Sequence, residues 1–163
     1  MKIKNIALIG MPGCGKSTVG GSLAQAMKRP LVDIDGMIEA AAGKSIPEIF
    51  AEDGEGAFRQ METHILGEEA AKSGIIIATG GGIVTRTENF DLLRQNSVIV
   101  YLKRGLKELA TNGRPLSGSV GVETLAKQRL PLYEAWSDFS VQAEADPRQT
   151  AERIMKILDD KEF

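Results

Sequence analysis

The chain has 163 residues, enough for one domain with a substantial hydrophobic core. Hydrophobic residues make up 42% and charged residues 26%, as in ordinary globular proteins, and a net charge of −2 argues against a nucleic-acid-coating surface. Without a membrane-length apolar run or a signal-peptide pattern, the sequence predicts a cytoplasmic protein with no nucleic-acid or membrane partner. A single cysteine excludes an intrachain disulfide and a thiolate metal cluster.

The first predicted strand covers residues 5–9 and leads into a glycine-rich loop at residues 10–17, the phosphate loop, which reads Gly-Met-Pro-Gly-Cys-Gly-Lys-Ser. The loop fits the pattern G-x-x-x-x-G-K-[ST] at every fixed position, and apolar residues at helical spacing follow it. Backbone N–H groups in such a loop cradle phosphates, Lys16 reaches the β and γ phosphates, and the Ser17 hydroxyl ligates Mg²⁺. We therefore expect a nucleotide to be bound by Gly13, Cys14, Gly15, Lys16, Ser17 and Thr18.

The second predicted strand, residues 31–34, carries two carboxylates near its end, Asp33 and Asp35. At positions i and i+2 of an extended segment they point to the same side, beside the phosphate loop. Such a pair is typical of Mg²⁺ handling or of activating a hydroxyl nucleophile. The alternative is a pair of solvated turn residues that cap the next helix.

The rest of the chain alternates predicted helices and strands. Ser45 and Glu48 form a capping-box signature. The remaining strands are expected at residues 75–78, 98–102 and 138–141, and the helices at 46–51, 55–72, 87–95, 106–111, 122–135 and 147–159. The third and fourth strands are continuous apolar runs, typical of strands covered on both faces. The series predicts a five-stranded parallel sheet in a three-layer α/β fold.

Glycines and arginines mark the further candidate sites. Gly80, Gly81 and Gly82, the glycine triplet, follow the third strand and allow a close backbone approach to a phosphate or a substrate, although a flexible turn is the alternative. Residues 112–121 have the glycine and proline content of a mobile flap. Three arginines, each more typical of a solvated surface when taken alone, lie in polar or glycine-rich context: Arg59, Arg114 and Arg129.

Two single residues admit a functional interpretation but favour a plain one. His64 lies in a predicted helix and is interpreted as a helix-face residue rather than a ligand or base. Cys14 is interpreted as a tolerated small residue of the phosphate loop. The alternative for Cys14 is a thiolate, stabilised by backbone amides, whose alkylation inactivates the protein unless MgATP protects it.

Taken together, these motifs resemble those of the shikimate kinase family from residue 6 to residue 158. Apart from the phosphate loop, the resemblance rests on an Asp-x-Asp element at 33–35, the helix and turn at 45–55, Phe58-Arg59 with Glu62, the segment 79–82, Gly-Arg-Pro-Leu at 113–116 and Arg-Leu-Pro-Leu-Tyr at 129–133. It implies a nucleoside-monophosphate-kinase-like P-loop fold, one domain over 1–163 with a substrate-binding segment at about 33–62 and a lid at about 112–121, and a monomer. The implied activity is transfer of the γ-phosphoryl group of ATP to the 3-hydroxyl of shikimate, a step in the biosynthesis of chorismate and the aromatic amino acids.

The resemblance also implies roles for individual residues. Asp33 holds Mg²⁺ through water together with Ser17, and Asp35 meets the acceptor hydroxyls. Lys16, Asp35 and Arg114 are the catalytic residues, while Arg59, supported by Glu62, and Arg129 bind the shikimate carboxylate beside the glycine triplet. The chain departs from relatives at Ala110, where an arginine commonly packs on adenine, and Lys107 or Arg148 is expected to replace that contact.

Other functions remain open at this point. A gluconate or nucleoside-monophosphate kinase is the nearest alternative, although Asp35 with Arg59 and Arg129 suits a polyol that bears one carboxylate. A GTPase-like switch is disfavoured because the sequence lacks an Asn-Lys-x-Asp segment. A degenerate homologue that binds without turnover is disfavoured because Lys16, Asp35 and Arg114 are all present.

Overall fold

A computed structural model describes residues 3–105, 121–161 and 163 of the chain. Five parallel strands form one sheet in the order β2-β3-β1-β4-β5. The strands are β1 (Asn5–Ile9), β2 (Leu31–Asp33), β3 (Ile76–Ala78), β4 (Ser97–Lys103) and β5 (Phe139–Gln142). This sheet confirms the predicted α/β class. The first strand has the predicted bounds, and the ends of the other four differ from the prediction by at most one residue.

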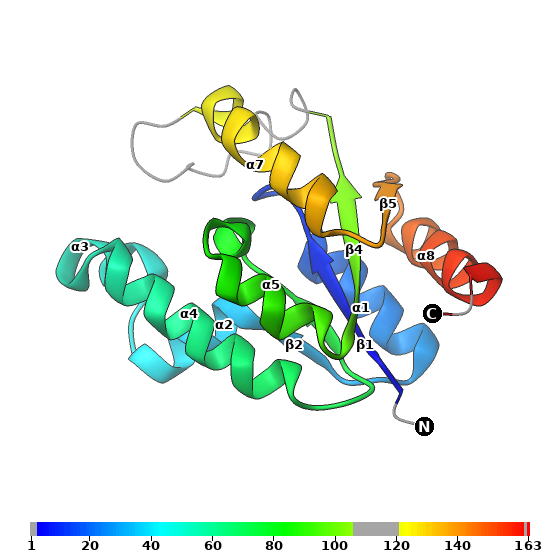
Figure 1. Ribbon diagram of the computed structural model, residues 1–163, viewed down its shortest axis with the longest axis horizontal. Helices are drawn as coiled ribbons and strands as arrows, with labels where there is room; N and C mark the ends of the chain where they lie inside the picture. Colours follow the sequence, from blue (N-terminus) through cyan, green and yellow to red (C-terminus); the bar gives the residue numbers. More distant parts are fainter. Residues whose placement is uncertain (1–2, 106–120, 162) are drawn as a thin grey trace.

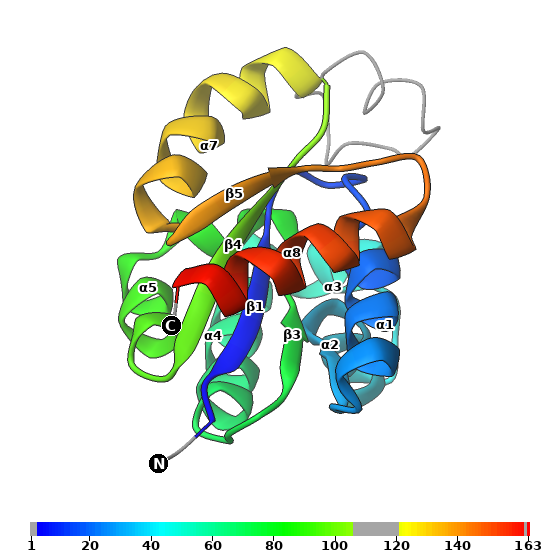
Figure 2. The ribbon, with the colours of Figure 1, turned by 90° about the vertical axis from the view of Figure 1, so that its right-hand side faces the viewer.

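Helices cover both faces of the sheet and make the predicted three layers. Figure 1 shows α1 and α8 on one side of the strands and α4, α5 and α7 on the other, and Figure 2 shows α8 running across the strands. The helices α2 and α3 pack on α4. Their bounds are α1 (Lys16–Met27), α2 (Ile34–Ala42), α3 (Ile46–Asp53), α4 (Glu55–Ala70), α5 (Thr87–Arg94), α7 (Val122–Trp136) and α8 (Pro147–Lys161), with a 3₁₀ helix η1 (Gly81–Thr85) after β3.

The core lies between the sheet and its two helical layers. Every residue of β1 and β3 is buried, and so are the first six of the seven residues of β4. Burial on both faces explains why these strands read as continuous apolar runs rather than as alternating patterns. In register, Ile6 of β1 stands between Ile76 of β3 and Val98 of β4, so the central strand has an apolar neighbour on each side.

The helix α2 is the main element that the sequence reading missed. The second strand ends at Asp33, and Ile34, which the sequence pattern places in the strand, is the first residue of α2. Asp33 caps the helix: its carboxylate accepts a hydrogen bond from the N–H of Gly36 at 3.4 Å. The two aspartates therefore do not share an extended segment, as expected from their spacing, but stand on either side of a strand-to-helix junction.

Other expectations match the structure closely. Ser45 caps α3 by accepting a hydrogen bond from the N–H of Glu48 at 3.3 Å, as the capping box predicts. His64 lies on the exposed face of α4 and pairs with Glu68. The helix expected at 106–111 lies outside the described residues. In the part of the chain that is described, no helix has the length and apolar character needed to cross a membrane.

Candidate active site

The phosphate loop connects β1 to α1 at the carboxyl ends of the strands. Gly13 and Gly15 have φ values of 81° and 96°, in the left-handed region that residues with a side chain rarely adopt. Gly15 is also the N-cap of α1, so the unpaired N–H groups of the helix start open toward the loop. The backbone thus has the conformation of an anion-binding cradle.

Lys16 is held across this loop by backbone carbonyl groups. Its Nζ donates hydrogen bonds to the carbonyl oxygens of Gly10 at 2.7 Å and Met11 at 3.0 Å. The side chain is only 8% exposed, yet it lines the cavity described below. An ammonium in this setting places one positive charge at the centre of the cradle, where phosphate oxygens would lie.

Ser17 and Asp33 place two oxygen donors side by side next to the loop. The Ser17 hydroxyl donates a hydrogen bond of 2.6 Å to Oδ2 of Asp33. Hydroxyl and carboxylate oxygens are hard ligands that suit Mg²⁺, which takes few protein ligands and completes its shell with water and phosphate. Among the described residues no group of three or more His, Cys, Asp or Glu could hold a metal, so a Mg²⁺ ion here would depend on the nucleotide for its remaining ligands.

Asp35 lies in the first turn of α2 and faces the cavity. Burial raises the pKa of Asp35 above its ordinary value of 3.8, and the neighbouring Lys16 ammonium opposes that rise. A carboxylate with a raised pKa beside a fixed ammonium is suited to orient a hydroxyl group and accept its proton.

The glycine triplet is packed so closely that side chains at its three positions would collide with the site. A Cβ on Gly80 would lie 2.6 Å from Oδ1 of Asp35, and one on Gly81 would lie 2.6 Å from the Pro12 ring. A Cβ on Gly82 would overlap the guanidinium of Arg59. The triplet is therefore a close-approach surface and not a flexible turn.

Gly82→Ala is expected to raise the KM for the acceptor substrate several-fold with little change in the KM for ATP. The added methyl group must displace the Arg59 guanidinium, and overpacking of this kind costs about 1–3 kcal/mol. Gly56→Ala is the matched control, because a Cβ there meets nothing within 4 Å. Steady-state kinetics in both substrates provide the measurement, and an unchanged acceptor KM in a folded Gly82→Ala protein would contradict the close packing.

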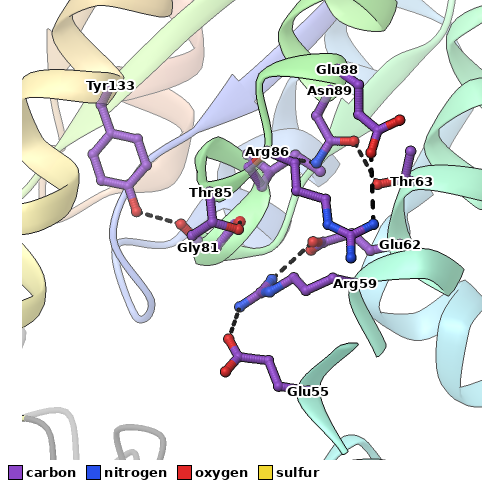
Figure 3. A network of polar contacts seen from close by, with 12 residues as sticks. Glu55, Arg59, Glu62, Thr63, Gly81, Thr85, Arg86, Glu88, Asn89 and Tyr133 are labelled. Atoms are coloured by element: carbon purple, nitrogen blue, oxygen red, sulfur yellow. Dashed lines mark hydrogen bonds and ion pairs between the residues drawn. The ribbon is translucent and has the colours of Figure 1, made fainter. Parts of the chain in front are cut away.

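Arg59 is buried on α4 with acidic partners on its own helix, as Figure 3 shows. Its Nη1 lies 2.8 Å from Oε1 of the fully buried Glu62, and its Nη2 lies 3.5 Å from the exposed Glu55. Burial raises the pKa of Glu62, while the Arg59 charge and hydrogen bond oppose the rise. Arg59 Nε and Glu62 Oε2 are buried without a hydrogen-bond partner among the described residues, and such orphan atoms point to a missing ligand or water.

One cavity of about 590 Å³ joins these groups. Its walls bring the two aspartates, Lys16, the glycine triplet and two buried arginines around a common space. The lining residues are Pro12, Gly13, Gly15, Lys16, Ser17, Thr18, Asp33, Asp35, Gly36, Glu39, Ile46, Phe50, Phe58, Arg59, Glu62, Thr79, Gly80, Gly81, Gly82 and Arg129. Arg59 and Arg129, separated by seventy positions in sequence, thus meet at the same cavity, and the charge of Arg129 also opposes the rise that burial causes in the pKa of Glu62.

Some predicted site residues lie elsewhere. The Cys14 side chain is buried, 1% exposed, and is absent from the cavity wall, which favours the interpretation as a small structural residue over an exposed thiol. Arg148 is exposed at the start of α8, pairs with Asp146 and does not line the cavity. Arg114, Lys107 and most of the expected lid at 112–121 lie outside the described residues.

The sequence reading missed several parts of the cavity wall. Phe50 and Phe58 form an aromatic pair with ring centroids 4.9 Å apart, and both line the cavity. Phe58 was named only as part of the Phe58-Arg59 motif, and neither ring was predicted to line the cavity, because both residues resemble ordinary core positions of amphipathic helices. Arg104, directly after β4, does not line the cavity but lies near the phosphate loop, where its Nη1 would be 3.8 Å from a Cβ on Gly15, and it was not among the predicted site residues. Its position at the carboxyl end of a central strand is the signal that could have found it.

Comparison with known proteins assigns the family. The family model described as "Shikimate kinase" matches residues 12–159. The chain belongs to the shikimate kinase family. Within the family, the shikimate kinase of Trichormus variabilis is 42% identical over 164 residues, covering 94% of this chain and 90% of its own.

Solved structures agree with this assignment. The structure of shikimate kinase from Acinetobacter baumannii in complex with shikimate has a TM-score of 0.90 at 34% identity and covers 98% of this chain and 95% of that one. A gluconokinase from Sinorhizobium meliloti shares only the fold, with a TM-score of 0.55 at 16% identity over the full length of both chains. The predicted membership of the shikimate kinase family is confirmed. The gluconokinase, from the alternative kinase class considered above, is far less similar to this chain than the shikimate kinase is.

Proposed function

We propose that this member of the shikimate kinase family transfers the γ-phosphoryl group of ATP to the 3-hydroxyl of shikimate. The observation that carries the proposal is the placement of Lys16 and Asp35 in the same cavity as the buried arginines Arg59 and Arg129. A cavity with these groups suits an acceptor that presents a hydroxyl group to the phosphate loop and a carboxylate to the arginines. Shikimate, a ring with three hydroxyl groups and one carboxylate, has both.

At the donor end, the chain binds polyphosphate with backbone and side-chain charge. The N–H groups of residues 13–17 hold the β-phosphate, Thr18 lines the same wall, and the Lys16 ammonium neutralises charge that moves onto the transferred group and the leaving oxygen. The oxygens of Ser17 and Asp33 are the groups that would hold Mg²⁺, which supplies further neutralisation of phosphate charge when it is bound.

At the acceptor hydroxyl, Asp35 has two tasks. Its carboxylate accepts a hydrogen bond from the 3-hydroxyl, which turns an oxygen lone pair toward the γ-phosphorus. As the new oxygen–phosphorus bond forms and the bond to the ADP oxygen breaks, the hydroxyl proton passes to Asp35. The raised pKa of Asp35, caused by burial, makes its carboxylate a better proton acceptor than an exposed aspartate.

At the other end of the acceptor, the guanidinium groups of Arg59 and Arg129 bind its carboxylate. Arg59 has Glu62 as a fixed partner on one side, which orients its remaining N–H groups, and Arg129 is 8% exposed. A planar guanidinium matches a carboxylate with two parallel hydrogen bonds. A neutral acceptor would offer no anionic partner to the N–H groups of the two guanidinium groups that face the cavity, so the site selects against it.

Three further assignments rest on the family resemblance. Arg114 is assigned to the transferred phosphoryl group, and closure of the segment 112–121 would exclude water and suppress ATP hydrolysis. Arg148 is assigned to the adenine end of the nucleotide. A monomer is the oligomeric state that the resemblance implies.

Gluconate and nucleoside monophosphates fit the cavity less well. A nucleoside monophosphate carries a base and a phosphate, while the described wall offers only one aromatic pair, Phe50 and Phe58, and a carboxylate-sized cationic end. Gluconate has a hydroxyl and a carboxylate but is an open chain, whose ordering costs more conformational entropy than that of a rigid ring.

Identification of the product tests the proposal. Incubation of the protein with MgATP and shikimate should yield ADP and a product heavier than shikimate by one phosphoryl group, with phosphorus–proton coupling at C3. A product phosphorylated at another hydroxyl would refute the assigned geometry. No product from shikimate, together with phosphorylation of gluconate or AMP, would refute the function.

Arg59→Lys and Arg129→Lys should each raise the shikimate KM at least about 10-fold and change the ATP KM less than about twofold. Lysine retains the charge but cannot form two parallel hydrogen bonds to a carboxylate, and each lost charge-assisted bond costs about 1.5–3 kcal/mol. Arg94→Lys is the matched control, because Arg94 is 64% exposed on α5. Equal increases in both KM values would show that these arginines do not act on the carboxylate.

A further inference from the structure

The three carbonyl groups of the glycine triplet accept hydrogen bonds from different parts of the chain. The Gly80 carbonyl accepts from the N–H of Ile83 at 3.2 Å, and the Gly82 carbonyl accepts from the Thr85 hydroxyl at 2.7 Å. Both donors follow within three residues, so these bonds fix only the local shape of η1. The Gly81 carbonyl instead accepts at 2.5 Å from the hydroxyl of Tyr133, 52 residues later on α7 (Figure 3).

Tyr133 also lies against Arg129. The two residues are four positions apart on α7 and therefore share one face of the helix. The Tyr133 side chain is fully buried, with its ring 5.2 Å from the ring of Tyr101. Burial raises the pKa of Tyr133, and the Arg129 guanidinium opposes the rise through its charge and a hydrogen bond. The hydroxyl therefore stays protonated at neutral pH. It accepts a hydrogen bond from the Arg129 guanidinium and donates one to the Gly81 carbonyl.

The helix α7 needs such an anchor near Arg129. Pro131 stands between Arg129 and Tyr133 and has no N–H for the carbonyl four residues earlier, so the helix is weakened at this point. At the start of α7, the N-cap Gly121 provides no side-chain hydrogen bond. The hydrogen bond from the Tyr133 hydroxyl to the Gly81 carbonyl connects this weakened turn of α7 to the glycine triplet.

A continuous set of contacts therefore links the two arginines of the cavity. It runs from Arg129 through Tyr133 to Gly81 and Gly82, and the backbone of Gly82 packs directly on the Arg59 guanidinium. We propose that Tyr133 is a positioning residue that sets the separation of the two guanidinium groups and so determines how strongly the site selects an acceptor with a carboxylate. The inference rests on the proposed function and adds a residue that never contacts the substrate.

Tyr133→Phe tests this role, because it removes one hydroxyl group and leaves the ring. We expect the shikimate KM to rise about 3- to 10-fold, the size of one lost neutral hydrogen bond, while the ATP KM changes less than about twofold. Selectivity for shikimate over its neutral carboxamide should fall by the same factor. Tyr101→Phe is the matched control: it removes a hydroxyl from the other ring of the pair and leaves the Gly81 contact in place.

A second variant distinguishes positioning of the two guanidinium groups from mere stabilisation of the glycine triplet. Thr85→Val removes the local bond to the Gly82 carbonyl and should lower Tm without changing the selectivity for acid over carboxamide. If Tyr133→Phe behaves in the same way, with a lower Tm and unchanged selectivity, the positioning role is overturned. If the wild-type protein releases no ADP in response to shikimate, the proposed function is overturned as well. If the wild-type protein is active and Tyr133→Phe has unchanged selectivity for acid over carboxamide, only this inference is overturned.

Discussion

Lys16→Met is expected to lower kcat about 10²- to 10³-fold while the protein remains folded. Methionine keeps the length of the side chain but removes the charge, and the loss of one preorganised donor at a developing charge costs about 2.7–4 kcal/mol. The ammonium is held in the cradle by the carbonyl oxygens of Gly10 and Met11, at the wall of the cavity.

The Lys16 variant is measured against a lysine far from the cavity. Lys72→Met removes an exposed ammonium that pairs with Glu69, and it should retain wild-type kcat. Far-ultraviolet circular dichroism and Tm report folding for both variants. A folded Lys16→Met protein with more than about a tenth of wild-type kcat would contradict the role of this charge.

Asp35→Asn should lower kcat about 10²- to 10⁴-fold with ATP binding nearly unchanged. The amide retains the size of the carboxylate and one acceptor oxygen, but it takes no proton and carries no charge beside Lys16. Steady-state kinetics and calorimetric titration with MgADP separate the two effects. Near-normal kcat with only a raised shikimate KM would reduce Asp35 to a binding residue.

The same substitution should make the folded protein more stable at neutral pH. Because burial raises the pKa of Asp35, the folded state binds this proton more tightly than the unfolded state, and ionisation above the ordinary value of 3.8 costs stability. Asparagine removes that cost, and each 1 kcal/mol gained raises Tm by about 2–4 °C in a protein of this size. Thermal melts should show the gain at pH 7 and its disappearance below pH 3.8; a lower Tm at pH 7 would contradict the burial cost.

The phosphate loop was predictable because its fixed positions are set by local geometry. Left-handed backbone at Gly13 and Gly15, a lysine and a hydroxyl must occur at one spacing wherever such a loop binds phosphate. The strands β3 and β4 were predictable for a similar reason, since burial on both faces requires apolar residues throughout.

The helix α2 was missed because two local signals conflict at its start. The β-branched residues Val32 and Ile34 favour a longer strand, while Asp33 as N-cap and the left-handed Gly43 at the C-cap favour a helix. Ile34 is fully buried, and its apolar side chain serves the core equally well in either conformation. The two capping residues were the signals that could have decided between a longer strand and a helix.

Contacts between segments far apart in the chain could not be predicted from local sequence patterns. The bond from Tyr133 to Gly81 depends on how α7 crosses the sheet, and nothing near either residue specifies it. The same is true of the meeting of Arg59 and Arg129 at one cavity, which only the family resemblance implied.

A coupled assay of ADP release with MgATP and three acceptors, shikimate, gluconate and AMP, tests the proposed acceptor of this protein. Shikimate should stimulate ADP release with a kcat/KM at least about 100-fold above that of either alternative, because only shikimate presents a hydroxyl and a carboxylate on one rigid ring of suitable size. Equal or greater stimulation by gluconate or AMP would contradict the proposed acceptor.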